Sequence, residues 1–205
     1  MNSIESVVLD TADPAAAEQF YERAFGLGDR VRVRAAGQAA GSGFRGYTLS
    51  LVVAQPSIVR GLVGAAVEAG ASEVKPVTKS LWGYGGVVRA PDGALWKVAT
   101  SAKKDTAPDS RTVDDVVLLL GASDVLASKR FYTEQGLAVG KSFGRRYVEF
   151  TTPGGGIKLA LYGRRALAKD AGVPPEGEGP HGLTIAASGT DAFTDPDGFA
   201  WQPAS

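Results

Sequence analysis

The chain has 205 residues, of which 44% are hydrophobic, so it can bury the core of one large domain or of two small ones. Its 22 lysine and arginine residues balance its 22 aspartate and glutamate residues, so no overall field draws it to nucleic acid or to an anionic membrane. Cysteine is absent, which excludes disulfides, thiolate metal ligands and cysteine nucleophiles, and the single histidine, His181, narrows metal and acid–base chemistry further.

The N-terminal segment predicts a strand, a helix and a second strand. Residues 4–10 are centred on Val7-Val8-Leu9 and predict a mostly buried strand, after which Asp13-Pro14 supplies the cap and the first turn of a helix. Residues 30–35 alternate arginine with apolar residues, as a half-exposed strand does. The apolar residues of the helix recur at the spacing of one helical face: Ala17, Phe20, Tyr21 and Ala24.

A second strand and helix follow. Residues 47–54 predict an apolar strand, and residues 56–70 predict a helix that begins at proline and closes at glycine. Residues 74–89 carry weaker strand signals on both sides of a glycine-rich run. The expected buried face of the second helix consists of Ile58, Leu62, Ala65, Ala66 and Ala69.

A turn motif at residues 91–100 occurs again at residues 196–205. Each copy is a Pro-Asp-Gly turn that runs into a short strand, because proline presets the first dihedral angle and glycine accepts a positive φ. Trp96 and Trp201 hold equivalent places in the two copies, and we expect both to be structural.

The repeat extends to other segments in the same order. Val116-Val117-Leu118 matches Val7-Val8-Leu9, and Phe131-Tyr132 matches Phe20-Tyr21. The sequence therefore predicts a first module, residues 1–100, a polar lysine-rich linker, residues 101–112, and a second, shortened module, residues 113–205.

The second module gains some segments and loses others. A hairpin of residues 147–152 and 157–162 is added, followed by a loop rich in glycine, proline and charge at residues 172–180. The counterpart of the helix at residues 56–70 is missing, as is the strand after it. Two modules of this kind predict an α+β fold in which helices cover one side of mixed sheets.

This order of motifs resembles the vicinal oxygen chelate superfamily, which includes glyoxalase I, bleomycin resistance proteins and extradiol dioxygenases. The resemblance covers nearly the whole chain and implies paired βαβββ modules whose sheets curl into a cup that holds the ligand or metal. The residues that carry it are Val7-Val8-Leu9, Asp13-Pro14, Phe20-Tyr21, Gly26-Leu27 and Pro91-Asp92-Gly93 with Trp96, and in the second module Asp195-Pro196-Asp197-Gly198 with Trp201.

The resemblance also implies where metal ligands would stand. Metal-dependent members carry a histidine on the first strand of a module and a glutamate on its last strand. By position, the first-strand sites fall on Ser6 and Asp115, and the last-strand sites fall on Lys97 and Gln202. An ammonium group at Lys97 would repel a divalent cation. We therefore expect no metal and no cofactor.

The residues also bear on two other kinds of chemistry. Asp115, His181 and Glu149 could form a residual metal site, since hard divalent ions accept carboxylate and imidazole together. No nucleophile-elbow sequence is present, and the glycine-rich residues 83–86 lack the lysine and the following helix of a phosphate-binding loop.

Several residues are candidates for binding a ligand. Trp82 and Tyr84 are flanked by glycines, and such aromatics either line ligand clefts or fill space in a core or dimer contact. Arg45 and His181 stand at equivalent middle-strand sites, and Glu149 could meet a cationic group. Five basic residues form either a solvated face or an anion contact: Arg145, Arg146, Lys158, Arg164 and Arg165.

The sequence therefore favours a metal-free protein that binds a small drug-like or metabolite molecule. The alternative is a metal-dependent lyase, isomerase or dioxygenase with a rearranged site, and a third possibility is a structural or regulatory partner with a closed cup. We expect a homodimer, because a shortened module exposes strand edge and apolar surface. No nucleic-acid or membrane partner is expected. The absence of a long apolar run and of a leader sequence favours the cytoplasm.

Overall fold

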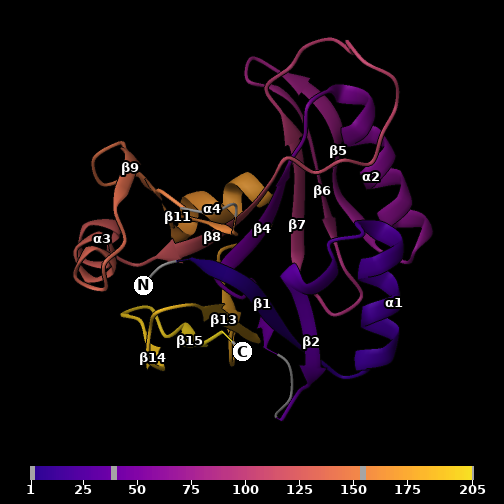
Figure 1. The fold of residues 1–205 in the computed structure, drawn as a ribbon. Helices are drawn as coiled ribbons and strands as arrows, with labels where there is room; N and C mark the ends of the chain where they lie inside the picture. The colour runs from indigo at the N-terminus through magenta and orange to yellow at the C-terminus, as the bar shows by residue number, and fades with distance from the viewer. Residues whose placement is uncertain (1–2, 38–40, 153–155, 205) are drawn as a thin grey trace.

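Two mixed β-sheets pack face to face at the centre of the molecule (Figure 1). The computed structural model describes residues 3–37, 41–152 and 156–204. The smaller sheet has the order β14-β15-β13-β1-β2 and consists of β1 (Ile4–Thr11), β2 (Val31–Ala35), β13 (Leu183–Ala187), β14 (Phe193–Thr194) and β15 (Ala200–Pro203). The larger sheet has the order β5-β6-β7-β4-β8-β11-β10-β9 and consists of β4 (Tyr47–Val52), β5 (Ser72–Ser80), β6 (Gly83–Arg89), β7 (Leu95–Thr100), β8 (Asp115–Ala122), β9 (Val139–Ser142), β10 (Tyr147–Phe150) and β11 (Lys158–Gly163). Outside both sheets, β3 (Ser42–Gly43) pairs with β12 (Gly177–Glu178).

The larger sheet contains two complete βαβββ units. β4 pairs in parallel with β7, and β8 pairs in parallel with β11; each pair is connected through a helix and a hairpin. β4 and β8 pair antiparallel, with Leu49 opposite Leu118, and so join the two units side by side. The parallel pairs β1–β2 and β13–β15 are shortened forms of the same unit, and they meet through β1 and β13.

The predicted α+β class with βαβββ-type units and open mixed sheets is therefore confirmed. The complete units span residues 47–100 and 115–163. The segments 1–100 and 113–205 each contribute strands to both sheets. The predicted hairpin of the second segment is formed by β10 and β11.

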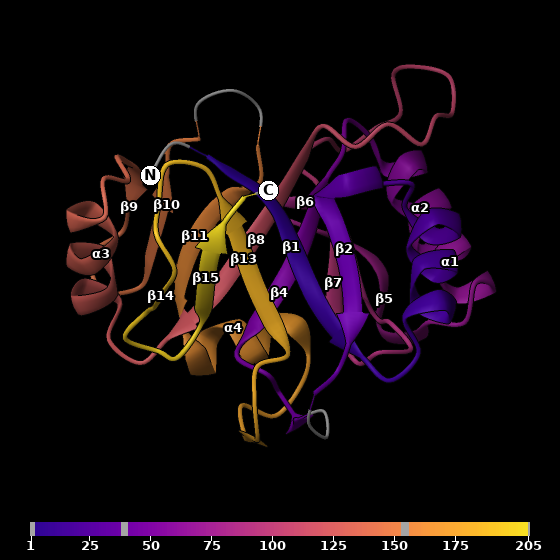
Figure 2. The same ribbon diagram turned by 60° about the horizontal axis from the view of Figure 1, so that its bottom comes forward.

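Three of the four α-helices in the described residues flank the two sheets. α1 (Pro14–Ala24) and α2 (Pro56–Glu68) lie along one side and α3 (Val125–Glu134) along the other, as Figure 2 shows. Asp13 caps α1, because its side chain accepts a hydrogen bond from the main-chain N–H of Ala16 at 3.0 Å. The predicted apolar face of α1 is buried: Ala17, Phe20, Tyr21 and Ala24.

The two Pro-Asp-Gly motifs form the same turn. The N–H of Gly93 donates to the carbonyl oxygen of Ala90 at 2.8 Å, and the N–H of Gly198 donates to that of Asp195 at 3.0 Å. Both glycines have φ near +90°, at 88° and 90°, a conformation that side chains disfavour. The internal repeat therefore extends to the hydrogen bonds of the turn.

The tryptophan after each turn is buried in the core, as expected. Trp96 packs against Tyr21 and Trp201 packs against Tyr132, with ring centroids 5.5 Å apart in both pairs and interplanar angles of 51° and 54°. Each turn is thus held to a helix of its own segment.

The two tyrosines donate to different aspartates of their turns. The hydroxyl of Tyr21 donates to Asp92 at 2.6 Å, whereas the hydroxyl of Tyr132 donates to Asp195 at 2.5 Å. Asp195 is only 6% exposed and also accepts two main-chain N–H groups of its turn at 2.9 and 2.8 Å. Burial raises the pKa of the Asp195 carboxyl and outweighs the hydrogen bonds that lower it.

This raised pKa predicts how stability depends on pH. A carboxyl whose pKa is higher in the folded state than its unfolded value of about 3.9 contributes stability that is fully present below that value. The contribution is lost as the pH rises through the native pKa of Asp195. We expect Asp195→Asn, which keeps an acceptor and cannot ionise, to gain stability relative to the wild type as the pH rises from about 4 through the native pKa of Asp195. Urea unfolding at a series of pH values measures the difference; a difference that is constant or falls with pH would contradict the raised pKa.

The linker is bound to the first turn of α2. Asp105 accepts the main-chain N–H of Ser57 at 2.6 Å and pairs with Arg60 at 3.0 Å. Gln55, which is 1% exposed, accepts the N–H groups of Thr106 and Ala107, both at 2.9 Å. Residues 101–112 therefore follow the surface of the first segment.

Candidate functional site

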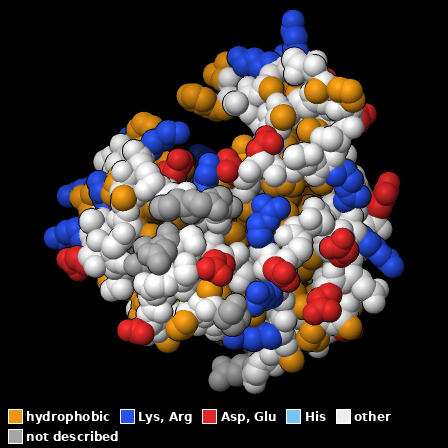
Figure 3. Space-filling view, in the orientation of Figure 1, with side chains coloured by type: hydrophobic (Ala, Val, Ile, Leu, Met, Phe, Trp, Pro, Cys, Tyr) orange, Lys and Arg blue, Asp and Glu red, His pale blue; other side chains and the backbone are white. Residues whose placement is uncertain are grey.

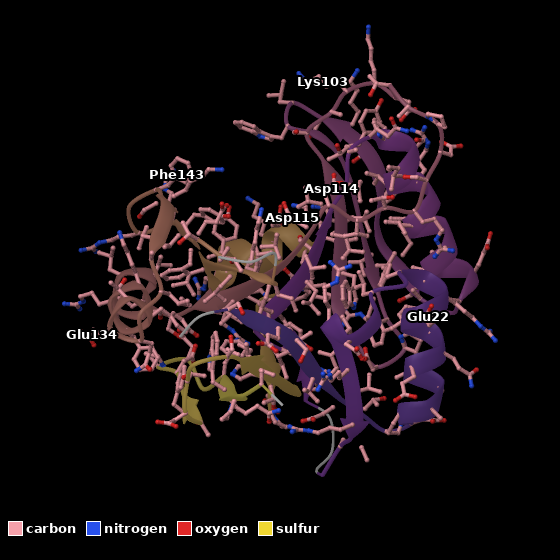
Figure 4. All side chains as sticks on the ribbon, viewed as in Figure 1. Glu22, Lys103, Asp114, Asp115, Glu134 and Phe143 are labelled. Carbon is pink, nitrogen blue, oxygen red and sulfur yellow. The ribbon has the colours of Figure 1, made fainter. Side chains whose placement is uncertain are left out.

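The larger sheet is curled, and its two ends stand on either side of a cleft. Figure 1 shows β5 and β6 at one end and β9 at the other, and Figure 3 shows the surface hollowed between them. Side chains alternate along β4, so Leu49 points into the core between the sheets and Ser50 lies on the cleft face. In Figure 4, Asp115 lies at the base of the cleft and Phe143, which is 64% exposed, lies at one rim.

A helix that the sequence did not predict lies in this cleft. α4 (Arg164–Ala171) packs on β4, β8 and β11. It buries Leu167, Ala168 and Ala171 against Phe44 and Leu95 in a small core separate from the main one. One part of the cup is therefore filled by the chain itself.

Polar contacts at both ends fix α4 in place. Near its C-terminus, the ammonium group of Lys97 contacts the two carboxylate oxygens of Asp170 at 2.7 and 3.0 Å, and Lys75 donates to the main-chain oxygen of Asp170 at 2.9 Å. At its N-terminus, Arg164 donates to the carbonyl oxygen of Phe44 at 2.9 Å, and its guanidinium group lies 5.3 Å from the centre of that ring. Arg164 therefore belongs to packing and not to a solvated basic face.

The remaining part of the cleft is a cavity of about 500 Å³, within the range of small-molecule sites. We refer to it as the Lys97 cavity. Strands β5, β6 and β7 and the end of α4 surround it. The side chains that matter for its chemistry are Val52, Lys75, Trp82, Lys97, Ala99 and Asp170.

Trp82 and Tyr84 both line this cavity, but they are placed differently. Trp82 is 86% exposed at the tip of the β5–β6 hairpin, whereas Tyr84 is partly buried and packs against the main core. The tip is closed by Ser80, whose hydroxyl accepts the N–H of Trp82 at 3.1 Å. Gly83 has a φ of 120°, and a Cβ there would lie 1.9 Å from the oxygen of Thr100. The backbone at the tip therefore requires glycine and holds Trp82 out at the rim.

Glu149 lies on the cleft face of β10, because its neighbours Val148 and Phe150 point into the core. It accepts the hydroxyl of Tyr147 at 2.9 Å and is 3.8 Å from Lys141. Burial, and then the hydrogen bond to Glu149, raise the pKa of Tyr147. Glu149 does not line the Lys97 cavity.

Arg45 and His181 are in contact with each other but away from the Lys97 cavity. One ring nitrogen of His181 is 2.5 Å from the carbonyl oxygen of Arg45, and the other is 3.0 Å from that of Asp197. The ring stacks on Phe199 at 3.9 Å. Arg45 in turn donates to the carbonyl oxygen of Asp92. These equivalent residues each bind the turn of their own segment, and both His181 nitrogens are engaged by main-chain oxygens.

The four degenerate metal positions fall in two places. Ser6 and Gln202 flank Ala186 in the smaller sheet. Lys97 and Asp115 lie in the cleft, where Lys97 is paired with α4 and Asp115 accepts Lys158 at 2.6 Å.

These residues do not fit a divalent ion. Within the described residues, no group of three or more histidine, aspartate or glutamate side chains could hold a metal ion, and Asp115, His181 and Glu149 form no such group. The ion pairs Lys97–Asp170 and Asp115–Lys158 leave each carboxylate with an ammonium partner. In the parts of the chain that the structure covers, no helix is both long enough and apolar enough to cross a membrane.

Only part of this site could be predicted from the sequence. Lys97 stood out because an ammonium replaces the expected glutamate, and Trp82 stood out because of its glycine neighbours. Lys75 and Asp170 were missed, since nothing in the sequence indicates that α4 returns to β7.

Comparison with known proteins identifies the fold. No family model matches the sequence, and no curated protein is significantly similar to it. Glyoxalase I from Zea mays is similar in structure, with a TM-score of 0.60 and 12% identity over 97% of this chain and 90% of that one. The V278E mutant of the same enzyme has a TM-score of 0.61 and 13% identity, over the same fractions of the two chains. A proposed dioxygenase from Bacillus subtilis has a TM-score of 0.55 and 12% identity, over 91% of this chain and 70% of that one. The resemblance to the vicinal oxygen chelate superfamily is therefore confirmed at the level of the fold, and the chain has the fold of glyoxalase I.

Proposed function

We propose that the chain binds a small organic molecule in the Lys97 cavity without the help of a metal ion. The observation that carries the proposal is Trp82, a large aromatic side chain held 86% exposed at the mouth of a cavity of about 500 Å³. An exposed tryptophan on a constrained hairpin is costly to leave in water and gains contact area when a ligand covers it.

The base of the cleft supports binding over metal catalysis. Ammonium–carboxylate pairs occupy the two degenerate metal positions that lie in the cleft, Lys97 and Asp115. The observed donor set gives no reason to favour a metal-dependent lyase, isomerase or dioxygenase. The open cavity beside α4 likewise argues against a purely structural role with a closed cup.

The three tryptophans provide a direct test. Trp96 and Trp201 are buried at 0% and 2% exposure, so acrylamide quenching of fluorescence reports mainly on Trp82. We expect a member of a library of small aromatic compounds both to raise the melting temperature and to protect Trp82 from quenching. At a ligand concentration of 100 times Kd the stabilisation is about 2.7 kcal/mol.

Two controls locate the binding. Trp82→Phe should abolish the quenching signal and leave the melting temperature of the free protein nearly unchanged, whereas Phe143→Ser at the opposite rim should leave the signal intact. A compound that stabilises the protein without protecting Trp82 binds elsewhere. If no compound stabilises the protein, or if protein purified without chelator carries one equivalent of a divalent ion, the proposal is wrong.

A further inference from the structure

We infer that the molecule bound in the Lys97 cavity is a small planar carboxylate, held at its charged end by Lys97 and Lys75. The inference rests on the proposed function and adds the chemical class of the ligand.

The lining of the Lys97 cavity has a net positive charge. Two ammonium groups, those of Lys75 and Lys97, converge on the single residue Asp170. These three are the charged side chains that line the cavity among the described residues, so its lining carries one uncompensated positive charge. An anion is therefore favoured over a cation.

The contacts of Lys97 with Asp170 do not use all of its hydrogen-bond donors. An ammonium group has three N–H donors, and the two contacts of Lys97 go to one carboxylate. One donor remains for a ligand. The side chains of Lys97 and Asp170 are 32% and 38% exposed, so a ligand can reach the pair without unfolding α4.

Small residues form the floor of the cavity beside Lys97. Gly85 and Ala99 are paired neighbours on β6 and β7, beside Lys97 on the cleft face. A Cβ at Gly85 would make only ordinary contacts, 3.7 Å from the Cβ of Ala99 and 4.0 Å from the Cε of Lys97, and φ at Gly85 is not in the left-handed region. Neither the backbone nor the packing requires glycine at position 85. Its effect is to leave a flat surface beside the ammonium group, on which a planar ring can lie.

Three probes of nearly the same shape test the charge. Benzoate, benzamide and benzamidine carry a negative, a neutral and a positive group on the same ring. We expect benzoate to bind about tenfold more tightly than benzamidine, with benzamide between them; this ratio corresponds to about 1.4 kcal/mol for partly exposed charges. Ligand-detected NMR measures the affinities, and Trp82 quenching places the probe.

Variants should move the preference in opposite directions. Lys97→Met should weaken benzoate binding about fivefold and strengthen benzamidine binding, whereas Asp170→Asn should strengthen benzoate binding several-fold. Gly85→Val should weaken all three probes, and its β-branched side chain suits a strand. Lys79→Met is the matched control, because Lys79 is an exposed lysine of β5 outside the cavity lining. If Lys97→Met does not fold, Asp170→Asn tests the same charge.

The outcomes separate this inference from the proposed function. Two results would show that the cavity binds ligands without preferring a carboxylate. One is that benzamide and benzamidine protect Trp82 as well as benzoate does, and the other is that Lys97→Met leaves the order of affinities unchanged. Either result overturns this inference and leaves the proposed function standing. If none of the three probes binds at millimolar concentration, the inference is overturned, and the proposed function is overturned with it only if no compound of the aromatic library stabilises the protein.

Discussion

Replacing Asp195 with alanine is expected to lower the free energy of unfolding by about 3 kcal/mol, because the variant leaves two buried donors and one part-buried donor without an acceptor. These donors are the hydroxyl of Tyr132 and two main-chain N–H groups of the second turn. Tyr132 is 0% exposed, so water cannot take the place of the carboxylate. The melting temperature should fall by about 6–12 °C for a domain of this size.

The first copy of the turn supplies the control. Asp92 accepts Tyr21 and one main-chain N–H, but it is only half-buried and water can reach it. We expect Asp92→Ala to cost about 1 kcal/mol. Urea unfolding of both variants at pH 7 makes the comparison. Equal costs would show that burial does not distinguish the two aspartates.

The sequence predicted those parts of the fold that depend on local signals. The helix at α1 was evident from Asp13-Pro14 and its apolar face, and the two turns were evident from their repeated Pro-Asp-Gly. The division of strands between the sheets could not be predicted. Val7-Val8-Leu9 and Val116-Val117-Leu118 have the same pattern, yet β1 lies in the smaller sheet and β8 in the larger. Only long-range pairing distinguishes them.

α4 was missed for a different physical reason. It is eight residues long and begins with Arg164-Arg165, so its apolar face consists of little more than Leu167 and small alanines. Such a short helix has little stability of its own and is held by packing in the cleft. The sequence pattern of a solvated basic segment and that of a helix with one buried face are therefore nearly the same.

The structure brings some of the candidate site residues together in one cavity and places others elsewhere. Trp82 and Tyr84 do reach one cavity. Arg45 and His181 were assigned equivalent positions, and the structure gives them equivalent contacts, but with the turns. Their role as ligand contacts stays a prediction, as does that of Glu149. The homodimer also stays a prediction, which light scattering can test.

Leu167→Ala is expected to destabilise the protein by about 3 kcal/mol, because this side chain is fully buried between α4 and the cleft face of the larger sheet. The cost combines the lost apolar transfer with the void that remains, since the strands beneath are fixed by their own pairing. Val67→Ala on α2 is the matched control: Val67 is 43% exposed, and its loss should cost less than about 0.5 kcal/mol.

Leu167→Ala also tests whether α4 is held rigidly beside the Lys97 cavity. If α4 is part of the rigid floor, Leu167→Ala should lower stability and leave the affinity of a ligand in the Lys97 cavity nearly unchanged, because Leu167 is not among the residues that line it. Urea unfolding and Trp82 quenching measure the two quantities on one sample. A cost below about 1 kcal/mol together with a changed affinity would mean that α4 is loosely seated and moves when the cavity fills. Lys97, through its bond to Asp170, would then connect ligand binding to the position of the helix.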